Sequence, residues 1–316
     1  FFSYPNQRDD PQRLFTTISY QWASKHKPYA EILKSTIHAD PTIVEKELPH
    51  QFHHLFVLPL QELEANGEDI PERVVIIDGL DECAGETAQR AIIQVIAASI
   101  RHNTTPFLWI FCSRLEPHLV ATFKSRAISV ATRQEELTVS RDIDKEIAKY
   151  LTDELSGIAE EHGLPRPWPR ERDVGTLINL SSGLFIYAST VIRFISDRNS
   201  FGPEDQLRAI LALATSVAGE PSEHPLSELD FFYLLIIQRI PSKLLQTVQW
   251  ILLATTISGI AERGRWIIQL LDLSTSQFHT ACRTLHAVMK VDQKHKQSKI
   301  VFYHASFMEF MQDSQR

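Results

Sequence analysis

Two apolar runs mark the strands of a predicted α/β domain. Residues 74–77 are four β-branched side chains in a row, and residues 107–111 form a second apolar run. Such runs are typical of strands buried on both faces of a parallel sheet. Residues 127–130 are a third predicted strand, and residues 1–4 read as a short buried strand.

Apolar residues at helical spacing separate these strands. After the first strand, Ile92, Ile93, Ile96 and Ile100 lie on one face of a predicted helix that Thr87 can cap. Strands that alternate with helices in this way predict βαβ units and a parallel sheet with right-handed crossovers.

Beyond about Gln134 the pattern becomes almost entirely helical, beginning with a helix that Ser140 caps. A predicted helical stretch over residues 174–195 is interrupted at Ser181-Ser182-Gly183, and the polar residues 219–225 form the best internal boundary. The later predicted elements are helices over residues 229–240, 244–257, 267–273 and 276–288, a strand over 300–303 and a helix over 304–311. We therefore expect three domains, over residues 1–133, 134–222 and 223–316.

Composition narrows the function classes. The formal net charge of -7 weighs against a nucleic-acid partner. The 3 cysteines are far apart without zinc or disulfide spacing, which favours a reducing, cytoplasmic location, and Cys112 is expected as a core thiol. The longest apolar segment is shorter than the roughly 20 residues of a membrane span, so no membrane partner is expected. Because the chain opens on Phe1 as if a strand were already under way, we expect a piece of a longer protein.

Three carboxylates follow the first predicted strand. Asp78 ends the strand, and Asp81 and Glu82 come after Gly79-Leu80. Ligands bind at the carboxyl ends of parallel strands. Asp78 there could hold Mg²⁺ through water, while Asp81 or Glu82 polarises the water that attacks a nucleotide. This pattern is that of a Walker B strand; the alternative is an acidic loop that merely starts a helix.

Two further residues are candidates for phosphate contacts. Arg114 follows the second strand, so it should lie beside Asp78, where it could bind a γ-phosphate or pair with a carboxylate. His304 lies where a predicted strand enters a helix, a position from which an imidazole can face a phosphate. The alternative for His304 is a packing histidine. No Gly-x-x-x-x-Gly-Lys-Ser/Thr loop, the Walker A signature, occurs in the sequence.

Together these motifs resemble a NACHT ATPase. They are the acidic strand end at Asp78, the sensor-like strand ending in Arg114, and Phe-Tyr-His304-Ala-Ser-Phe-Met-Glu-Phe. The chain is most similar to the fungal set with a nephrocystin-3-like N-terminal region, through residues 1–3, 12–21 and 182–188. The resemblance implies a signalling NTPase of the STAND class with a P-loop NTPase domain, a helical domain and a winged-helix domain.

The resemblance also implies roles and partners. ATP or ADP with Mg²⁺ would drive a conformational switch, with self-oligomerisation and signalling proteins as partners, and His304 would touch the β-phosphate of ADP. The chain departs from this family pattern in two ways. It is expected to be truncated after the Walker A loop, and the fragment is therefore expected to be inactive. In addition, Gly183-Leu184-Phe185 stands where NOD-like receptors have a Gly-x-Pro motif that contacts adenine. Two other hypotheses stay open, a non-catalytic interaction scaffold and a DNA-binding winged helix with its basic run at residues 290–299.

Overall fold

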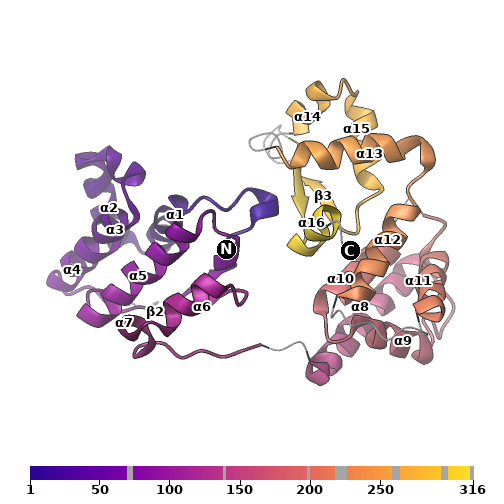
Figure 1. The fold of residues 1–316 in the computed structure, drawn as a ribbon, viewed down its shortest axis with the longest axis horizontal. Coiled ribbons are helices and arrows are strands. Elements are labelled where there is room, and N and C mark those ends of the chain that lie inside the picture. Colours follow the sequence, from indigo (N-terminus) through magenta and orange to yellow (C-terminus); the bar gives the residue numbers. More distant parts are fainter. Residues whose placement is uncertain are drawn as a thin grey trace. The chain divides into compact units, whose positions relative to one another are not determined.

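The chain divides into two compact units, each with its own apolar core. This computed structural model describes residues 1–69, 74–137, 140–197, 200–217, 226–257, 264–292 and 298–313. The units are Phe1–Glu135 and Glu136–Arg316, and each is mostly helical (Figure 1). The boundary expected at 222/223 lies outside the described residues, so the division of residues 134–316 into two domains stays a prediction.

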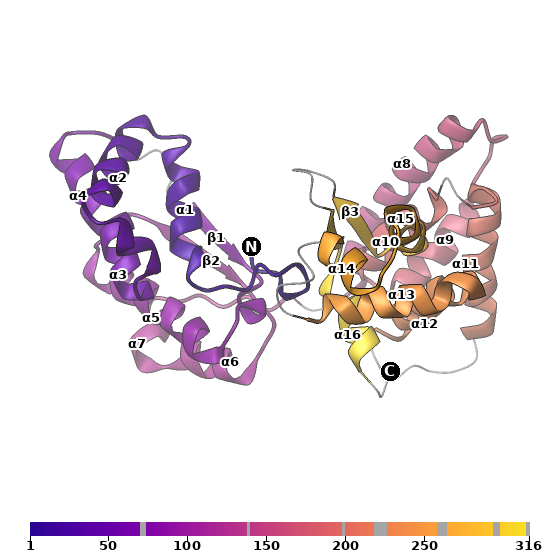
Figure 2. The same cartoon turned by 90° about the horizontal axis from the view of Figure 1, so that it is seen from above.

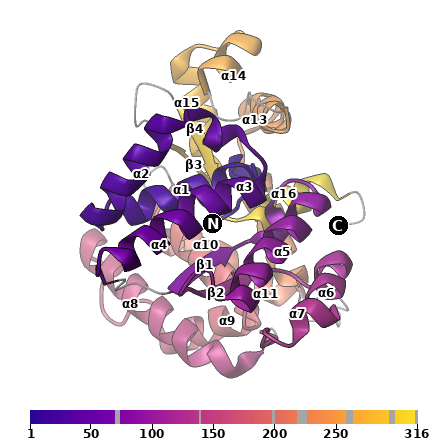
Figure 3. The same ribbon diagram turned by 90° about the vertical axis from the view of Figure 1, so that its left-hand side faces the viewer.

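The first unit is a helical layer packed on a small parallel sheet. Its long helix α5 (Glu86–His102) connects strand β1 (Val74–Asp78) to strand β2 (Leu108–Cys112), which is the βαβ unit that the pattern predicted. Figure 2 shows the two strands side by side, and Figure 3 shows α6 and α7 beside α5. The remaining elements are the 3₁₀ turns η1 (Tyr4–Asn6), η2 (Pro41–Glu45) and η4 (Leu80–Glu82), the helices α1 (Arg13–Ala23), α2 (Lys27–Ala39), α3 (Leu48–Phe52), α4 (Leu58–Ala65), α6 (Pro117–Lys124) and α7 (Arg126–Ser129), and the π-helical turn η3 (His53–Val57) between α3 and α4.

Among the described residues, the parallel sheet is packed on one face, which corrects the expectation of strands buried on both faces. Val75 and Trp109, paired in register, point into the core with 7% and 9% exposure. Ile76 and Leu108, on the opposite face, are 62% and 61% exposed. The described part of the first unit holds two strands, and its helices pack on the face that carries Val75.

Three other local predictions are wrong. Residues 127–130 fall in the short helix α7 and the turn after it, because so short a segment, with Ser129 between two apolar residues, fits a helical turn as well as a strand. Residues 1–4 form no strand beyond an isolated bridge between Ser3 and Arg8. Helix α5 starts at Glu86 after Gly85, so Thr87 lies inside its first turn and does not cap it.

The second unit contains the predicted helices in their predicted order, and one further helix over Pro203–Val217 that was not predicted. The predicted interruption at Ser181-Ser182-Gly183 separates two helices, and Ser140 caps the turn η5 (Arg141–Ile143) that leads into the first helix. Its helices are α8 (Asp144–His162), α9 (Glu171–Ser181), α10 (Phe185–Ile195), α11 (Pro203–Val217), α12 (Ser227–Gln238), α13 (Ser242–Thr255), α14 (Gly264–Leu270), α15 (Thr275–Arg283) and α16 (Ala305–Gln312).

A small antiparallel sheet completes the second unit. Strand β3 (Met289–Asp292) pairs with β4 (Lys299–Phe302), and Met289 and Phe302 bury side chains in the core. The strand predicted at residues 300–303 is therefore present, and β4 leads directly into α16. Within the described residues, no helix has the length and apolarity that crossing a membrane requires.

Candidate functional site

The carboxyl end of β1 presents Asp78 to solvent. Asp78 pairs in register with Cys112 of β2, and both side chains lie on the exposed face of the sheet. The Asp78 carboxylate has no hydrogen bond or ion pair to any residue in the part of the chain that is described here. Cys112 is exposed as well, so its expected place as a core thiol is wrong; it belongs to the uncovered sheet face.

Gly79 makes the turn that follows. Its φ of +71° lies in the left-handed region that glycine adopts without a steric penalty. A Cβ at this position would lie 2.8 Å from the carbonyl oxygen of Phe2, whose own N–H donates to the Asp78 carbonyl at 2.8 Å. The turn thus packs against the start of the chain, and η4 follows it directly.

Asp81 is tied to Arg114. Its side chain is 9% exposed, and its Oδ1 accepts a hydrogen bond from the backbone N–H of Arg114 at 3.1 Å. The Arg114 Nε lies 3.7 Å from Asp81 Oδ2, with the arginine side chain half exposed. The structure therefore brings the two candidate residues together, in the carboxylate–arginine pairing that the sequence left as one alternative.

Glu82 and a residue that the sequence did not single out hold the rest of the turn. Glu82 Oε2 accepts from the Tyr4 N–H at 3.0 Å. The buried Gln89 donates from Nε2 to the carbonyls of Asp81 at 3.1 Å and Cys83 at 2.5 Å, while its Oε1 meets His118 Nε2. A lone glutamine on a helix gives no signal in a sequence, because only the folded turn shows which carbonyls it reaches.

At the carboxyl end of β1, Asp78 is the one exposed carboxylate that could bind a metal ion without first losing a described hydrogen bond. In the described ranges no three His, Cys, Asp or Glu side chains come close enough to hold an ion. Mg²⁺ in nucleotide sites is bound through one or two carboxylates plus the phosphates and several waters. The exposed Asp78 fits that donor set, whereas Asp81 and Glu82 already accept hydrogen bonds from the backbone.

His304 lies in the second unit and caps α16. Its Nδ1 accepts from the Ser306 backbone N–H at 3.1 Å and lies 2.7 Å from Ser306 Oγ. Ser306 Oγ in turn is 2.8 Å from the Tyr233 hydroxyl, whose pKa is raised by burial to about 12. Because Nδ1 accepts from a backbone N–H, the neutral ring in this contact carries its proton on Nε2.

Gly183 fixes the geometry of the second motif. Its φ is +77°, and a Cβ there would overlap the carbonyl of Ser140. Leu184 then takes the N-cap position of α10, with Phe185 as the first helical residue, 43% exposed. This glycine is required by close backbone packing within the second unit.

A comparison with known protein families gives a match over the first part of the chain. The family model described as Nephrocystin 3, N-terminal, matches residues 1–114. The match includes Asp78, Asp81, Glu82 and Arg114 and does not reach His304. No curated protein and no solved structure matches the chain.

Proposed function

We propose that the chain is part of a nucleotide-dependent switch, a NACHT-type signalling NTPase of the STAND class, in which the first unit has the P-loop NTPase fold and the second carries the helical and winged-helix domains. The observation that carries this proposal is the parallel pairing of β1 with β2, which gathers Asp78, Asp81 and Arg114 at one sheet edge inside the matched residues. Open α/β sheets bind ligands at such an edge.

Each residue at this edge has a distinct part in the proposal. Asp78 would hold Mg²⁺ through water, and the ion would neutralise charge on the phosphates of ATP. Asp81 would position Arg114, whose guanidinium would bind the γ-phosphate. Glu82 accepts a hydrogen bond from the Tyr4 N–H, so a role for Glu82 or Asp81 in polarising water requires that these carboxylates give up their present hydrogen bonds.

For the second unit, the proposal gives His304 the contact with the β-phosphate of ADP that the resemblance implies. The tautomer selected by Ser306 supports this, since a phosphate needs a donor and Nε2 carries the proton. A nucleotide that binds one conformation better than another shifts the population toward it, and that differential affinity would drive switching and self-assembly.

The phosphate-binding loop is the part that residues 1–316 do not supply. Backbone N–H groups and the lysine of a Walker A loop provide most phosphate contacts in such sites. We therefore expect no measurable ATPase activity and very weak nucleotide binding from this chain alone.

Calorimetry with MgATP and MgADP tests this expectation, and micromolar affinity would contradict it. A second experiment tests for weak binding at the sheet edge. It measures whether millimolar MgATP slows the reaction of the exposed Cys112, which pairs in register with Asp78, with a thiol reagent. The proposal expects protection in the wild type and its loss in Asp78→Asn, with Glu64→Gln on α4 as the control that keeps it. Equal reactivity with and without nucleotide would count against the site.

A non-catalytic interaction scaffold is the second candidate. It is favoured by the engagement of Asp81 and Glu82 in hydrogen bonds to the backbones of Arg114 and Tyr4, which a purely structural turn would also use. The coding sequence upstream of Phe1 separates the two candidates. A Gly-x-x-x-x-Gly-Lys-Ser/Thr there supports the switch, and an intact gene without one supports the scaffold.

A further inference from the structure

Three histidines gather where helix α3 leads into the π-helical turn η3. They are His50, His53 and His54, and the first and last have the His-x-x-x-His spacing that places two imidazoles on one face of a helix. The ring centroids of His50 and His54 lie 4.2 Å apart, and the ring planes make an angle of 27°. His53 is exposed and meets the His54 ring with its edge. His50 and His54 are therefore the pair that shares a face.

A buried tyrosine holds the backbone of this π-helical turn. Pro59 has no N–H to donate to the carbonyl of Leu55, four residues before it. This carbonyl accepts instead from the Tyr29 hydroxyl at 2.6 Å, and both Tyr29 and Leu55 are buried. The backbone next to His54 is thus tied to the core of the first unit. Single π-helical turns of this kind occur frequently at functional sites.

One nitrogen of the His50–His54 pair is buried without a hydrogen bond. His50 Nε2 is shielded from solvent and has no hydrogen-bond partner among the described residues. A buried polar atom without a partner costs free energy in the folded state. The nitrogen lone pair of a neutral imidazole is a preferred ligand of divalent transition metal ions. An ion bound at this nitrogen would therefore supply the missing partner.

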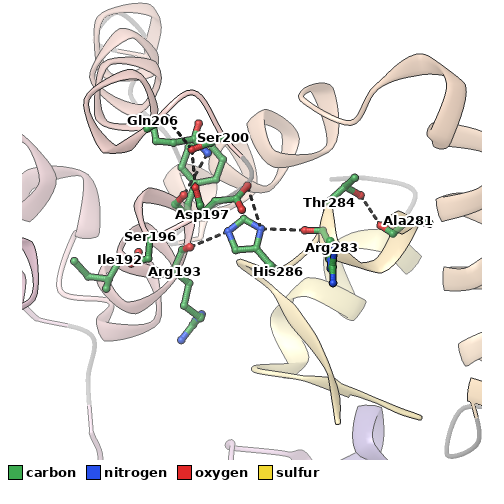
Figure 4. Close-up of polar contacts among 12 residues, drawn as sticks. Ile192, Arg193, Ser196, Asp197, Ser200, Gln206, Ala281, Arg283, Thr284 and His286 are labelled. Carbon is green, nitrogen blue, oxygen red and sulfur yellow. Dashed lines mark hydrogen bonds and ion pairs between the residues drawn. The ribbon is translucent and has the colours of Figure 1, made fainter. Parts of the chain in front are cut away.

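His286 in the second unit shows the contrasting case. Its Nε2 lies 2.8 Å from the carbonyl oxygen of Arg193, and its Nδ1 lies 3.1 Å from the carbonyl oxygen of Arg283 (Figure 4). Asp197 Oδ2 lies 3.7 Å from the same Nδ1. Both ring nitrogens of His286 thus face oxygen atoms of the chain, and an ion would have to displace one of these contacts. His50 Nε2 has no such contact to lose.

We propose that His50 and His54 form a binding site for one divalent transition metal ion such as Zn²⁺, with water in the remaining coordination positions. No third His, Cys, Asp or Glu side chain completes a ligand set within the described ranges, so the site binds more weakly than zinc sites with three or four protein ligands. Imidazole lone pairs lie in the ring plane, and the two planes are nearly parallel. Binding therefore turns the rings until both lone pairs point at the ion. The site does not depend on the proposed nucleotide site.

Calorimetry of the full chain with zinc chloride at neutral pH tests the site. The titration is made in a Cys112→Ser background, which removes the exposed thiol as a competing ligand. Loss even of a residue that only supports a metal ligand weakens metal binding by about 10–100-fold, so we expect H50Q and H54Q to bind Zn²⁺ at least about tenfold more weakly. H53Q is the matched control and should bind as the parent does. Equal binding by the parent, H50Q and H54Q, or no binding at millimolar Zn²⁺, would overturn the proposal.

Proton NMR of the histidine rings provides a second measurement, which the parent protein answers even if H50Q or H54Q does not fold. Zn²⁺ should shift the ring signals of His50 and His54, because binding separates the stacked rings, and should leave those of His286 unchanged. The signals are assigned from the variants or, without them, from through-space contacts along η3. A response at His53 alone, or an equal response of all histidines, would show only adventitious surface binding and would contradict the proposal.

Discussion

Two turns in this chain lead from a strand into a helical segment and carry a candidate phosphate-contacting residue, and they use it in opposite ways. In the turn after β1, both Asp81 carboxylate oxygens face Arg114, and Glu82 accepts from Tyr4. In the turn after β4, His304 uses one ring nitrogen to cap α16, which leaves the proton on the other. In the first turn, the carboxylates form hydrogen bonds that hold the turn itself. In the second turn, Nδ1 of His304 accepts the capping hydrogen bond, and this places the proton of the neutral ring on Nε2.

This difference shows that a polar residue at a strand end has two separable properties. One is its position at the edge, which follows from topology alone. The other is whether its polar atoms are already paired within the turn, which depends on the local conformation. Asp78, one residue before Gly79, has the position without any described partner, and Asp81 has both the position and a partner.

The largest expected effect comes from Gly79, whose turn conformation creates the Asp81–Arg114 pairing. Gly79→Ala adds strain at a positive φ and pushes a Cβ into the Phe2 carbonyl, so we expect a loss of about 3 kcal/mol. Gly67→Ala is the matched control, because its φ is +72° and nothing lies within 4 Å of the added Cβ. Hydrogen exchange of α5 in urea measures both. Equal losses would show that the Phe2 contact contributes nothing.

The next effect separates Asp81 from Asp78. Asp81→Ala leaves the Arg114 N–H without its acceptor beside a guanidinium, so we expect a loss of about 2 kcal/mol, mostly from the backbone hydrogen bond because Arg114 is half exposed. Asp78→Ala should change stability by less than about 0.5 kcal/mol, since the exposed Asp78 carboxylate makes no hydrogen bond or ion pair with any described residue. The same exchange experiment compares them. A costly Asp78→Ala would mean that Asp78, like Asp81, has a structural role.

Much of the framework was accessible from sequence, for reasons that particular residues make clear. Residues 74–78 and 107–111 are read as strands because runs of β-branched and aromatic residues favour strands, and their parallel pairing predicts Arg114 at the same sheet edge as Asp78, where the structure pairs it with Asp81. The exposure of Ile76 could not be predicted from the sequence, because hydrophobic periodicity does not show which elements cover a face of the sheet. The Arg114 N–H as the partner of Asp81 was not accessible either, since it depends on the backbone angles at Gly79.

The His304 cap is expected to contribute less to stability. His304→Ala removes the acceptor of the Ser306 N–H at the start of α16, which should cost about 1 kcal/mol. His304→Asn keeps a capping oxygen and should stay within about 0.5 kcal/mol of the wild type, while it removes the Nε2 N–H. Hydrogen exchange of α16 gives the comparison. If Asn and Ala are equally destabilising, the cap is not what His304 provides.

The smallest expected effect is on the rate of thiol labelling, which does not change the stability of the protein. It compares Cys83, which follows the turn after β1, with Cys112 at the end of β2. Burial raises the pKa of Cys83 to about 12, whereas Cys112 is exposed at the end of β2. Because the thiolate is the reactive form, a maleimide at pH 8 should label Cys112 quickly and Cys83 only after the turn opens. Cys282, whose pKa burial also raises to about 12, should stay unlabelled in the second unit.

The same labelling of Cys83, measured in Asp81→Ala and Asp78→Ala, shows how often the turn after β1 opens. Cys83 follows Glu82 directly, and its carbonyl is held by Gln89. Asp81→Ala should therefore speed the labelling of Cys83 in a Cys112→Ser background, and Asp78→Ala should not. Fast labelling of Cys83 in the wild type would mean that the turn opens readily without any mutation. The Asp81–Arg114 hydrogen bond would then not hold the turn closed, and Asp81 and Asp78 would not differ in this respect.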